Sequence, residues 1–158
     1  MKDFLIIGNG NATHYKNIFP LMKSGVIKVG YKKFSGMEFY AGDNYDDKKC
    51  KTSKIDDKGN VIIAVPMCIW YTTLRKETNK EFTLTKTYNN NDYPKYDYYD
   101  AIEVDKCDNI PCDYYGKMGV PTTFFGKWNK EQFELLDCIN PTINGKNVYS
   151  RLIIKRKI

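Results

Sequence analysis

Only a few residues of this 158-residue chain have the types and spacing that catalysis or metal binding requires. Gly8 and Gly10 follow an apolar run, as in a phosphate-binding loop. The third glycine of the dinucleotide fingerprint is missing, however, and no Lys-Ser or Lys-Thr pair follows. We therefore interpret this stretch as a polar turn at the end of a strand. The single histidine, His14, has no serine or cysteine motif to partner it, so we expect a capping or surface role rather than catalysis.

The five cysteines predict neither a metal site nor a disulfide framework. Cys107 and Cys112 are only two potential ligands, and a structural zinc ion needs four. The sequence shows no signal-peptide pattern and no apolar run near the roughly 20 residues of a membrane span. We therefore expect a cytoplasmic protein with reduced thiols, no metal and no membrane partner.

The formal net charge of +6 is concentrated toward the later end of the sequence. A basic surplus favours a polyanionic partner, because lysine and arginine release counterions when they contact phosphates. Under that hypothesis the candidate phosphate contacts are Lys32, Lys33, Arg151, Lys155 and Arg156. The alternative is a basic protein with no polyanionic partner, and charge alone does not choose between them.

The elements that must position these residues begin with the run Phe4 to Ile7, which is apolar on both faces and predicts a buried, central strand. Thr13 is a candidate N-cap for a helix that carries Tyr15 to Met22 at helical spacing and ends near Gly25, with a kink or restart at Pro20. A strand, a polar loop and a helix in this order build ligand sites in α/β folds.

The rest of the chain predicts a mixed, strand-rich α/β domain. Residues 41–60 are polar and predict a long loop or excursion. The stretch from Met118 to Leu136 predicts two strands joined by a turn through Gly126 and Asn129. Further strands are predicted at Val26 to Val29, Val61 to Val65, Met67 to Leu74, Phe82 to Tyr88, Ala101 to Val104 and Tyr149 to Lys157.

Several strings along the chain, taken together, resemble the EcoRI-type family of adenine-specific DNA methyltransferases. They occur in the family's order and span nearly the whole chain: Phe4 to Ala12, Tyr15 to Leu21, Met37 to Phe39, Cys68 to Leu74, Tyr93 to Asp97, Tyr99 to Val104, Ile110 to Tyr114 and Met118 to Leu136. The resemblance implies methyl transfer from S-adenosylmethionine to the N6 amino group of adenine in double-stranded DNA, with the target base flipped out of the helix.

The sequence departs from the family pattern in lacking both the Asn-Pro-Pro-Phe tetrapeptide and the Gly-rich loop after a first strand. The nearest string is Asn140-Pro141-Thr142. The resemblance therefore implies a C-terminal portion with no catalytic residue. S-adenosylmethionine would be the cofactor of the complete family enzyme and is not expected to bind this chain alone. Asn9 and Asn11, at the end of a strand, could line the target-base or donor pocket of a complete enzyme; the alternative is that they are turn-forming asparagines.

The family architecture gives a division of the chain into four expected segments. Residues 1–40 would be the later strand–helix–strand of a Rossmann-like sheet, and 41–60 a polar loop. Residues 61–115 would be an inserted or appended target-recognition region, and 116–158 a closing β-hairpin with a basic C-terminal strand. Within this hairpin, Phe124, Phe125, Phe133 and Leu135 are expected to be core residues.

Three functional alternatives remain open. The chain could complete a methyltransferase when an N-terminal half is supplied in trans, bind DNA on its own without catalysis, or be a decayed remnant. If the preceding strands are missing, Phe4 to Ile7 would form an exposed apolar edge. Methylation with a supplied half, salt-sensitive DNA binding by the chain alone, and loss of a cooperative thermal transition would distinguish them.

Overall fold

The structure is a computed structural model that describes residues 2–30, 36–42, 53–74 and 79–157. Lys32 and Lys33, two of the predicted phosphate contacts, lie outside these residues. The described part is mixed and strand-rich with short helices, which confirms the predicted mixed architecture at that level. Among its strands only β7 and β8 pair in parallel, so a Rossmann-like parallel sheet is not seen in the described ranges.

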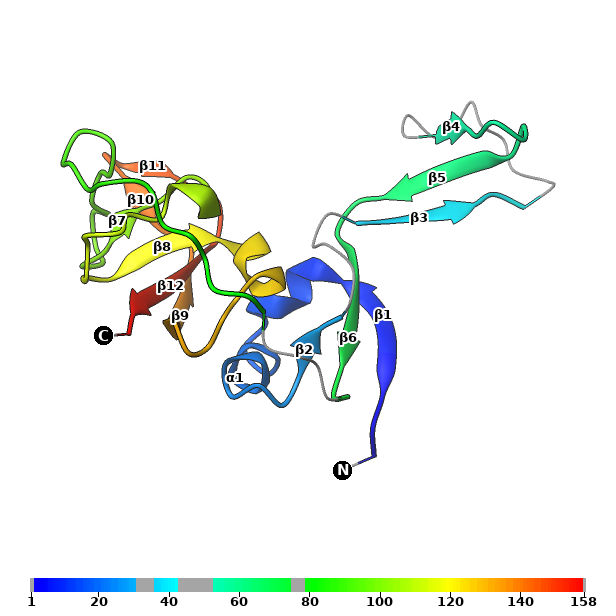
Figure 1. The fold of residues 1–158 in the computed structure, drawn as a ribbon, viewed down its shortest axis with the longest axis horizontal. Coiled ribbons are helices and arrows are strands. Elements are labelled where there is room, and N and C mark those ends of the chain that lie inside the picture. Colours follow the sequence, from blue (N-terminus) through cyan, green and yellow to red (C-terminus); the bar gives the residue numbers. More distant parts are fainter. Residues whose placement is uncertain (1, 31–35, 43–52, 75–78, 158) are drawn as a thin grey trace.

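The larger sheet has the strand order β7-β8-β12-β9 (Figure 1). Its strands are β7 (Ile102–Glu103), β8 (Met118–Pro121), β9 (Phe133–Ile139) and β12 (Arg151–Arg156). Strand β12 lies between β8 and β9 and runs antiparallel to both. The predicted hairpin over Met118 to Leu136 is therefore wrong, because its two strands are both formed but each pairs with β12 and not with the other.

The segment between β8 and β9 contributes aromatic residues to the main core. It contains the 3₁₀ helix η4 (Thr122–Gly126). Phe124 and Phe133 have no exposed surface, and their rings meet edge to face at 5.6 Å between centroids. Phe125 and Leu135 are also buried, so the predicted core role of these residues is confirmed.

The segment Phe82 to Tyr88 does not form the predicted strand. Its alternating pattern is present, and the Phe82 ring stacks on Phe124 at 5.5 Å between centroids. Its backbone is held by a side chain instead of a neighbouring strand: the Phe82 N–H donates to Gln132 Oε1 at 2.7 Å, and Gln132 Nε2 donates to the Phe82 carbonyl at 2.9 Å. Among the described residues, only a bridge between Lys86 and Pro111 adds a β-type contact.

A smaller sheet has the order β1-β6-β2, with β6 (Cys68–Thr72) paired antiparallel to both β1 (Leu5–Asn9) and β2 (Lys28–Val29). After β1 the chain forms the 3₁₀ helix η1 (Gly10–His14) and then the short helix α1 (Phe19–Lys23). Proline lies in the first turn of α1, where its missing N–H is not needed. Of the helix predicted over Tyr15 to Met22, only α1 is formed, with Pro20 in its first turn. The predicted N-cap role of Thr13 is wrong, because Thr13 lies inside η1 and donates to the Gly10 carbonyl.

A third sheet, of order β3-β5-β4, projects as an arm from the rest of the molecule (Figure 1). It consists of β3 (Met37–Tyr40), β4 (Ser53–Ile55) and β5 (Val61–Val65), all antiparallel. Part of the predicted polar loop is thus a strand, while residues 43–52 lie outside the described ranges. Because β5 belongs to the arm and β6 pairs with β1, the strand pairing crosses the predicted boundary at residue 61.

Two small elements complete the described chain. The hairpin of β10 (Thr142–Ile143) and β11 (Lys146–Asn147) turns at Asn144 and Gly145, whose φ values of 52° and 74° match a type I′ turn. The 3₁₀ helix η3 (Cys107–Asn109) precedes β8. No helix in the described ranges is long and apolar enough to cross a membrane, and those ranges hold no cluster of three metal-ligating side chains.

Candidate functional site

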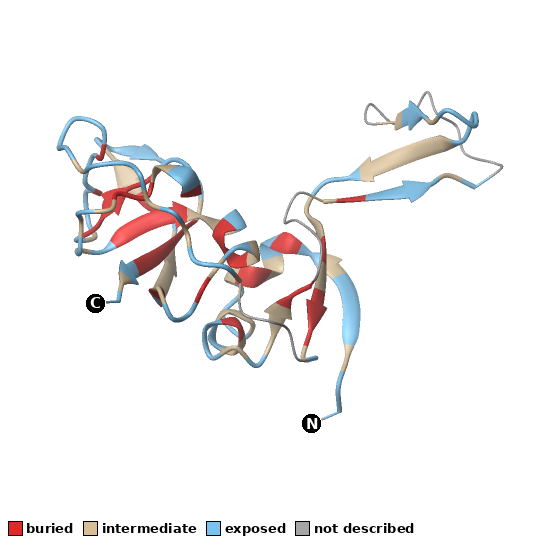
Figure 2. Cartoon of the chain, in the orientation of Figure 1, coloured by how far each residue is buried: buried red, intermediate tan, exposed pale blue. Residues whose placement is uncertain are grey.

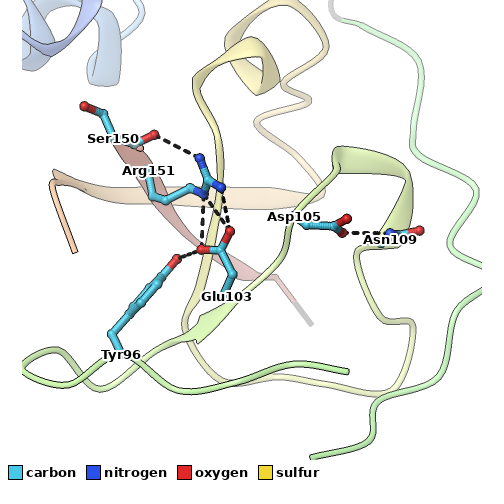
Figure 3. Close-up of polar contacts among 6 residues, drawn as sticks. All are labelled: Tyr96, Glu103, Asp105, Asn109, Ser150 and Arg151. Atoms are coloured by element: carbon cyan, nitrogen blue, oxygen red, sulfur yellow. Dashed lines mark hydrogen bonds and ion pairs between the residues drawn. The ribbon is translucent and has the colours of Figure 1, made fainter. Parts of the chain in front are cut away.

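Arg151, predicted to contact phosphate, is instead part of a buried polar network (Figure 3). It begins the central strand β12 and is 8% exposed, and Glu103 on β7 is 7% exposed. Arg151 Nη2 and Nε lie 2.6 and 2.9 Å from Glu103 Oε1. The Tyr96 hydroxyl donates to Glu103 Oε2 at 2.5 Å. The phosphate assignment of Arg151 is therefore wrong, because its charge is already paired inside the protein.

Gly119 makes room for this network. A Cβ atom at this position of β8 would overlap the Tyr96 hydroxyl. Burial, and next the neighbouring Glu103 carboxylate, raise the pKa of Tyr96, so its hydroxyl stays protonated and donates. The side chain of Tyr96 therefore requires a glycine at position 119.

Lys155 and Arg156, the other two predicted phosphate contacts that the structure describes, differ in exposure. Lys155 is exposed, near the end of β12. Arg156 is partly buried: its Nη1 donates to the Cys112 carbonyl, and its guanidinium lies 5.0 Å from the centre of the Tyr115 ring. Lys155 therefore remains free to meet a phosphate, whereas Arg156 anchors the segment that carries Cys112 and Tyr115.

Asn9 and Asn11 lie together at the end of β1, as expected from the sequence. Asn9 Oδ1 accepts from the Asn11 N–H at 2.8 Å and so caps η1. The Tyr71 hydroxyl donates to the Asn9 carbonyl at 2.7 Å, and burial raises the pKa of Tyr71 to about 12. These contacts give Asn9 a turn-forming role. Its neighbour His14 is half-buried at the end of η1, where burial lowers its pKa.

Strand β1 is an exposed apolar edge (Figure 2). Leu5, Ile6 and Ile7 are 46%, 52% and 46% exposed, so the prediction of a buried central strand is wrong for the described chain. Within the described ranges β1 pairs with β6 on one side and with no strand on the other. Its side chains are therefore uncovered on both faces, and one row of its backbone groups is open to a further strand.

A cleft of about 490 Å³ lies where α1 and β2 meet β9. Of the residues that the structure describes, four lysines line it, Lys23, Lys28, Lys130 and Lys157, and Glu134 is the one lining carboxylate; we call it the lysine cleft. Its apolar wall includes Phe125, Trp128, Phe133 and Leu135. This site could not be found from the sequence, because its lysines come from three separate segments, around residues 23–28, 130 and 157, and only the surplus of positive charge pointed to it.

Comparisons with known proteins agree with the resemblance found in the sequence. The family model described as adenine-specific methyltransferase EcoRI matches residues 1–157. Type II methyltransferase M.EcoRI of Escherichia coli is 42% identical over 165 residues, which cover 99% of this chain and 51% of the relative. Type II methyltransferase M.MpnI of Mycoplasma pneumoniae is 36% identical over 184 residues, covering 99% of this chain and 57% of the relative.

A third relative has the same relation to the chain. Type II methyltransferase M.MgeORF184P of Mycoplasma genitalium is 36% identical, with 57% of its length covered. The chain thus spans about half the length of these relatives. No solved structure matches it. Because the family model covers essentially all of the sequence, the chain belongs to the EcoRI-type family of adenine-specific methyltransferases.

Proposed function

We propose that the chain is the C-terminal portion of a site-specific DNA adenine-N6 methyltransferase that uses S-adenosylmethionine. It contributes DNA recognition and completes the enzyme's sheet, and it is inactive by itself. Family membership supports the reaction class. The absence of Asn-Pro-Pro-Phe from these 158 residues supports placing catalysis in the portion of the relatives that the chain does not span.

The observation that carries this proposal is the exposed edge of β1. Burying an aliphatic side chain completely stabilises a protein by about 1.5–3 kcal/mol, so covering the exposed half of Leu5, Ile6 and Ile7 would contribute about 1 kcal/mol each. A strand added along the open edge would also pair its backbone groups. The portion of a methyltransferase that the chain does not span is the partner whose sheet this edge would continue.

The residues of this chain do not by themselves fit the methyl donor. The chain lacks the Gly-rich loop after a first strand that holds the donor in the family, and Asn9 Oδ1 is already engaged by the Asn11 N–H. The donor would therefore be held by the complementary portion. Asn9 and Asn11, at the end of the docking strand, would border that pocket without forming it.

The test is complementation. The chain is co-expressed with the N-terminal half of the Escherichia coli relative, and N6-methyladenine is measured in plasmid DNA by nucleoside mass spectrometry. Ile6→Lys places a charge on the β1 edge. Ile55→Lys is the matched control, because Ile55 is also an exposed strand isoleucine, at 68%, but lies on the arm.

We expect methylation from the wild-type pair and from Ile55→Lys, loss with Ile6→Lys, and none from either half alone. Co-purification of the two halves should follow the same pattern. The proposal fails if the halves neither associate nor methylate, or if Ile6→Lys behaves like Ile55→Lys.

The lysine cleft favours a second candidate function, a stand-alone DNA-binding module without catalysis. In that case the isolated chain would bind duplex DNA tightly, and the supplied half would neither associate with it nor restore methylation.

A further inference from the structure

We propose that the lysine cleft holds the sugar–phosphate backbone of duplex DNA. The inference rests on the proposed function only in taking DNA as the partner. Three of the four lysines to which it assigns the contact, Lys23, Lys28 and Lys130, lie outside the basic C-terminal strand. The assignment follows from the placement, charge and surroundings of the four ammonium groups.

The two walls of the cleft are fixed relative to each other. Lys23 ends α1, and its Nζ donates to the Leu136 carbonyl of β9 at 2.8 Å, which joins segments 113 residues apart. The Lys157 N–H donates to the Gln132 carbonyl at 2.9 Å, which fixes the backbone of Lys157 beside the start of β9. The Lys23 ammonium and the backbone of Lys157 are therefore placed before a ligand arrives, and this lowers the entropy lost on binding.

The charges of the cleft are largely uncompensated. Among the described lining residues there are four lysines and one glutamate, an excess of three positive charges. Lys23 and Lys28 donate to backbone carbonyls, which leaves their charge in place and leaves each ammonium further protons to donate. Among the described residues no carboxylate lies within 4.0 Å of Lys23, Lys28 or Lys157, and Lys130 has only a 3.9 Å contact with Glu131.

The apolar wall strengthens the positive electrostatic potential of the cleft. Phe125, Phe133 and Leu135 are buried behind the lysines, and low-dielectric walls concentrate the potential in a charged cleft. The Trp128 indole N–H donates to the Phe133 carbonyl at 2.9 Å, so the position of its ring is fixed. A ring held beside ammonium groups suits a ligand that alternates apolar sugars with phosphates, which favours a nucleic-acid backbone over an isolated anion.

Binding is measured with the complete 158-residue chain and a fluorescein-labelled duplex, by anisotropy over a series of KCl concentrations. The test variant is Lys130→Gln with Lys157→Gln, which removes two charges from exposed lining residues of the cleft. The matched control is Lys58→Gln with Lys146→Gln, which removes two charges at exposed lysines in the arm's turn and on β11.

We expect the cleft variant to weaken binding by roughly tenfold at about 0.1 M salt, and to flatten the slope of log K against log salt by about 1.8, because each phosphate contact contributes about 0.9. The control should change the affinity by less than about twofold. Inorganic phosphate at millimolar concentration should not displace the duplex beyond the effect of its ionic strength.

Equal losses in the two variants would show diffuse attraction and would overturn the assignment. Competition by inorganic phosphate above its ionic-strength effect would also overturn it, by showing a small-anion site, as would a wild-type chain that does not bind the duplex. If a chain with both cleft substitutions still complements methylation, the assignment of DNA contact to the cleft is refuted and the proposed function is not. Failed complementation with intact, cleft-dependent DNA binding would refute the proposed function and leave the cleft standing.

Discussion

Replacing Glu103 by glutamine should strongly lower the free energy of unfolding, although the side chain changes by a single heavy atom. The substitution keeps the shape of the side chain but removes the countercharge of Arg151, which is 8% exposed and makes contacts of 2.6–3.1 Å to the carboxylate. Breaking a buried ion pair from one side costs about 3–5 kcal/mol, because the remaining charge is left without a partner or water. A domain of this kind has about 5–15 kcal/mol of stability in total.

The assay is urea unfolding followed by circular dichroism. With a slope of about 2 kcal/mol per molar urea, the Glu103→Gln midpoint should fall by about 1.5–2.5 M. Glu38→Gln is the matched control: it breaks a 2.8 Å pair with Lys54 whose side chains are 57% and 55% exposed, and such pairs contribute less than about 1 kcal/mol. Adding Arg151→Met to Glu103→Gln should recover part of the loss, because no charge is then left unpaired.

Equal midpoint shifts for Glu103→Gln and Glu38→Gln would refute this reasoning. So would a double variant whose loss is the sum of the two single losses, since the network would then contribute no coupling.

Three further predictions follow from contacts in the same structure. Gly119→Ala should destabilise the fold by about 2 kcal/mol or more, because its Cβ overlaps the Tyr96 hydroxyl, and Tyr96→Phe in the same chain should recover part of that loss in urea unfolding. The pKa of Tyr71 is raised from 10.0 to about 12, so its contribution to stability is fully present below pH 10 and is lost as the pH rises to 12; Tyr71→Phe should show a smaller loss over that window. Gln132→Ala should speed hydrogen exchange at the Phe82 N–H at least tenfold, and an unchanged rate would show that Gln132 does not hold this segment.

The core of the larger sheet could be predicted from the sequence because its signal is local. Phe124, Phe133 and Leu135 are apolar residues close together in the chain, and burial follows directly from their type. The pairing of their strands is not local. Strand β12 enters between β8 and β9 from residues 151–156, and no pattern within 118–136 indicates that a later segment separates them.

The contacts of the basic residues were likewise unpredictable, because they depend on partners distant in the sequence. Arg151 looks like a surface charge in the sequence, and only the fold places Glu103, 48 residues away, against its guanidinium. The alternation in Phe82 to Tyr88 predicted a strand, but a glutamine side chain takes the place of the neighbouring strand. The lysines of the cleft carry no motif at all, since Lys23 and Lys157 come together only through tertiary packing.

The central position of β12 has a consequence for how the protein is made. A ribosome releases β8 and β9 before β12, and among the described strands these two have no direct pairing with each other. Until residues 151–156 emerge, β8 can pair only with β7, and β9 has no partner strand among those described. A nascent chain stalled or cut before that point would expose two strand edges at once and become a substrate for chaperones or proteases. The larger sheet can thus be completed only when six residues, translated after both flanking strands, insert between them.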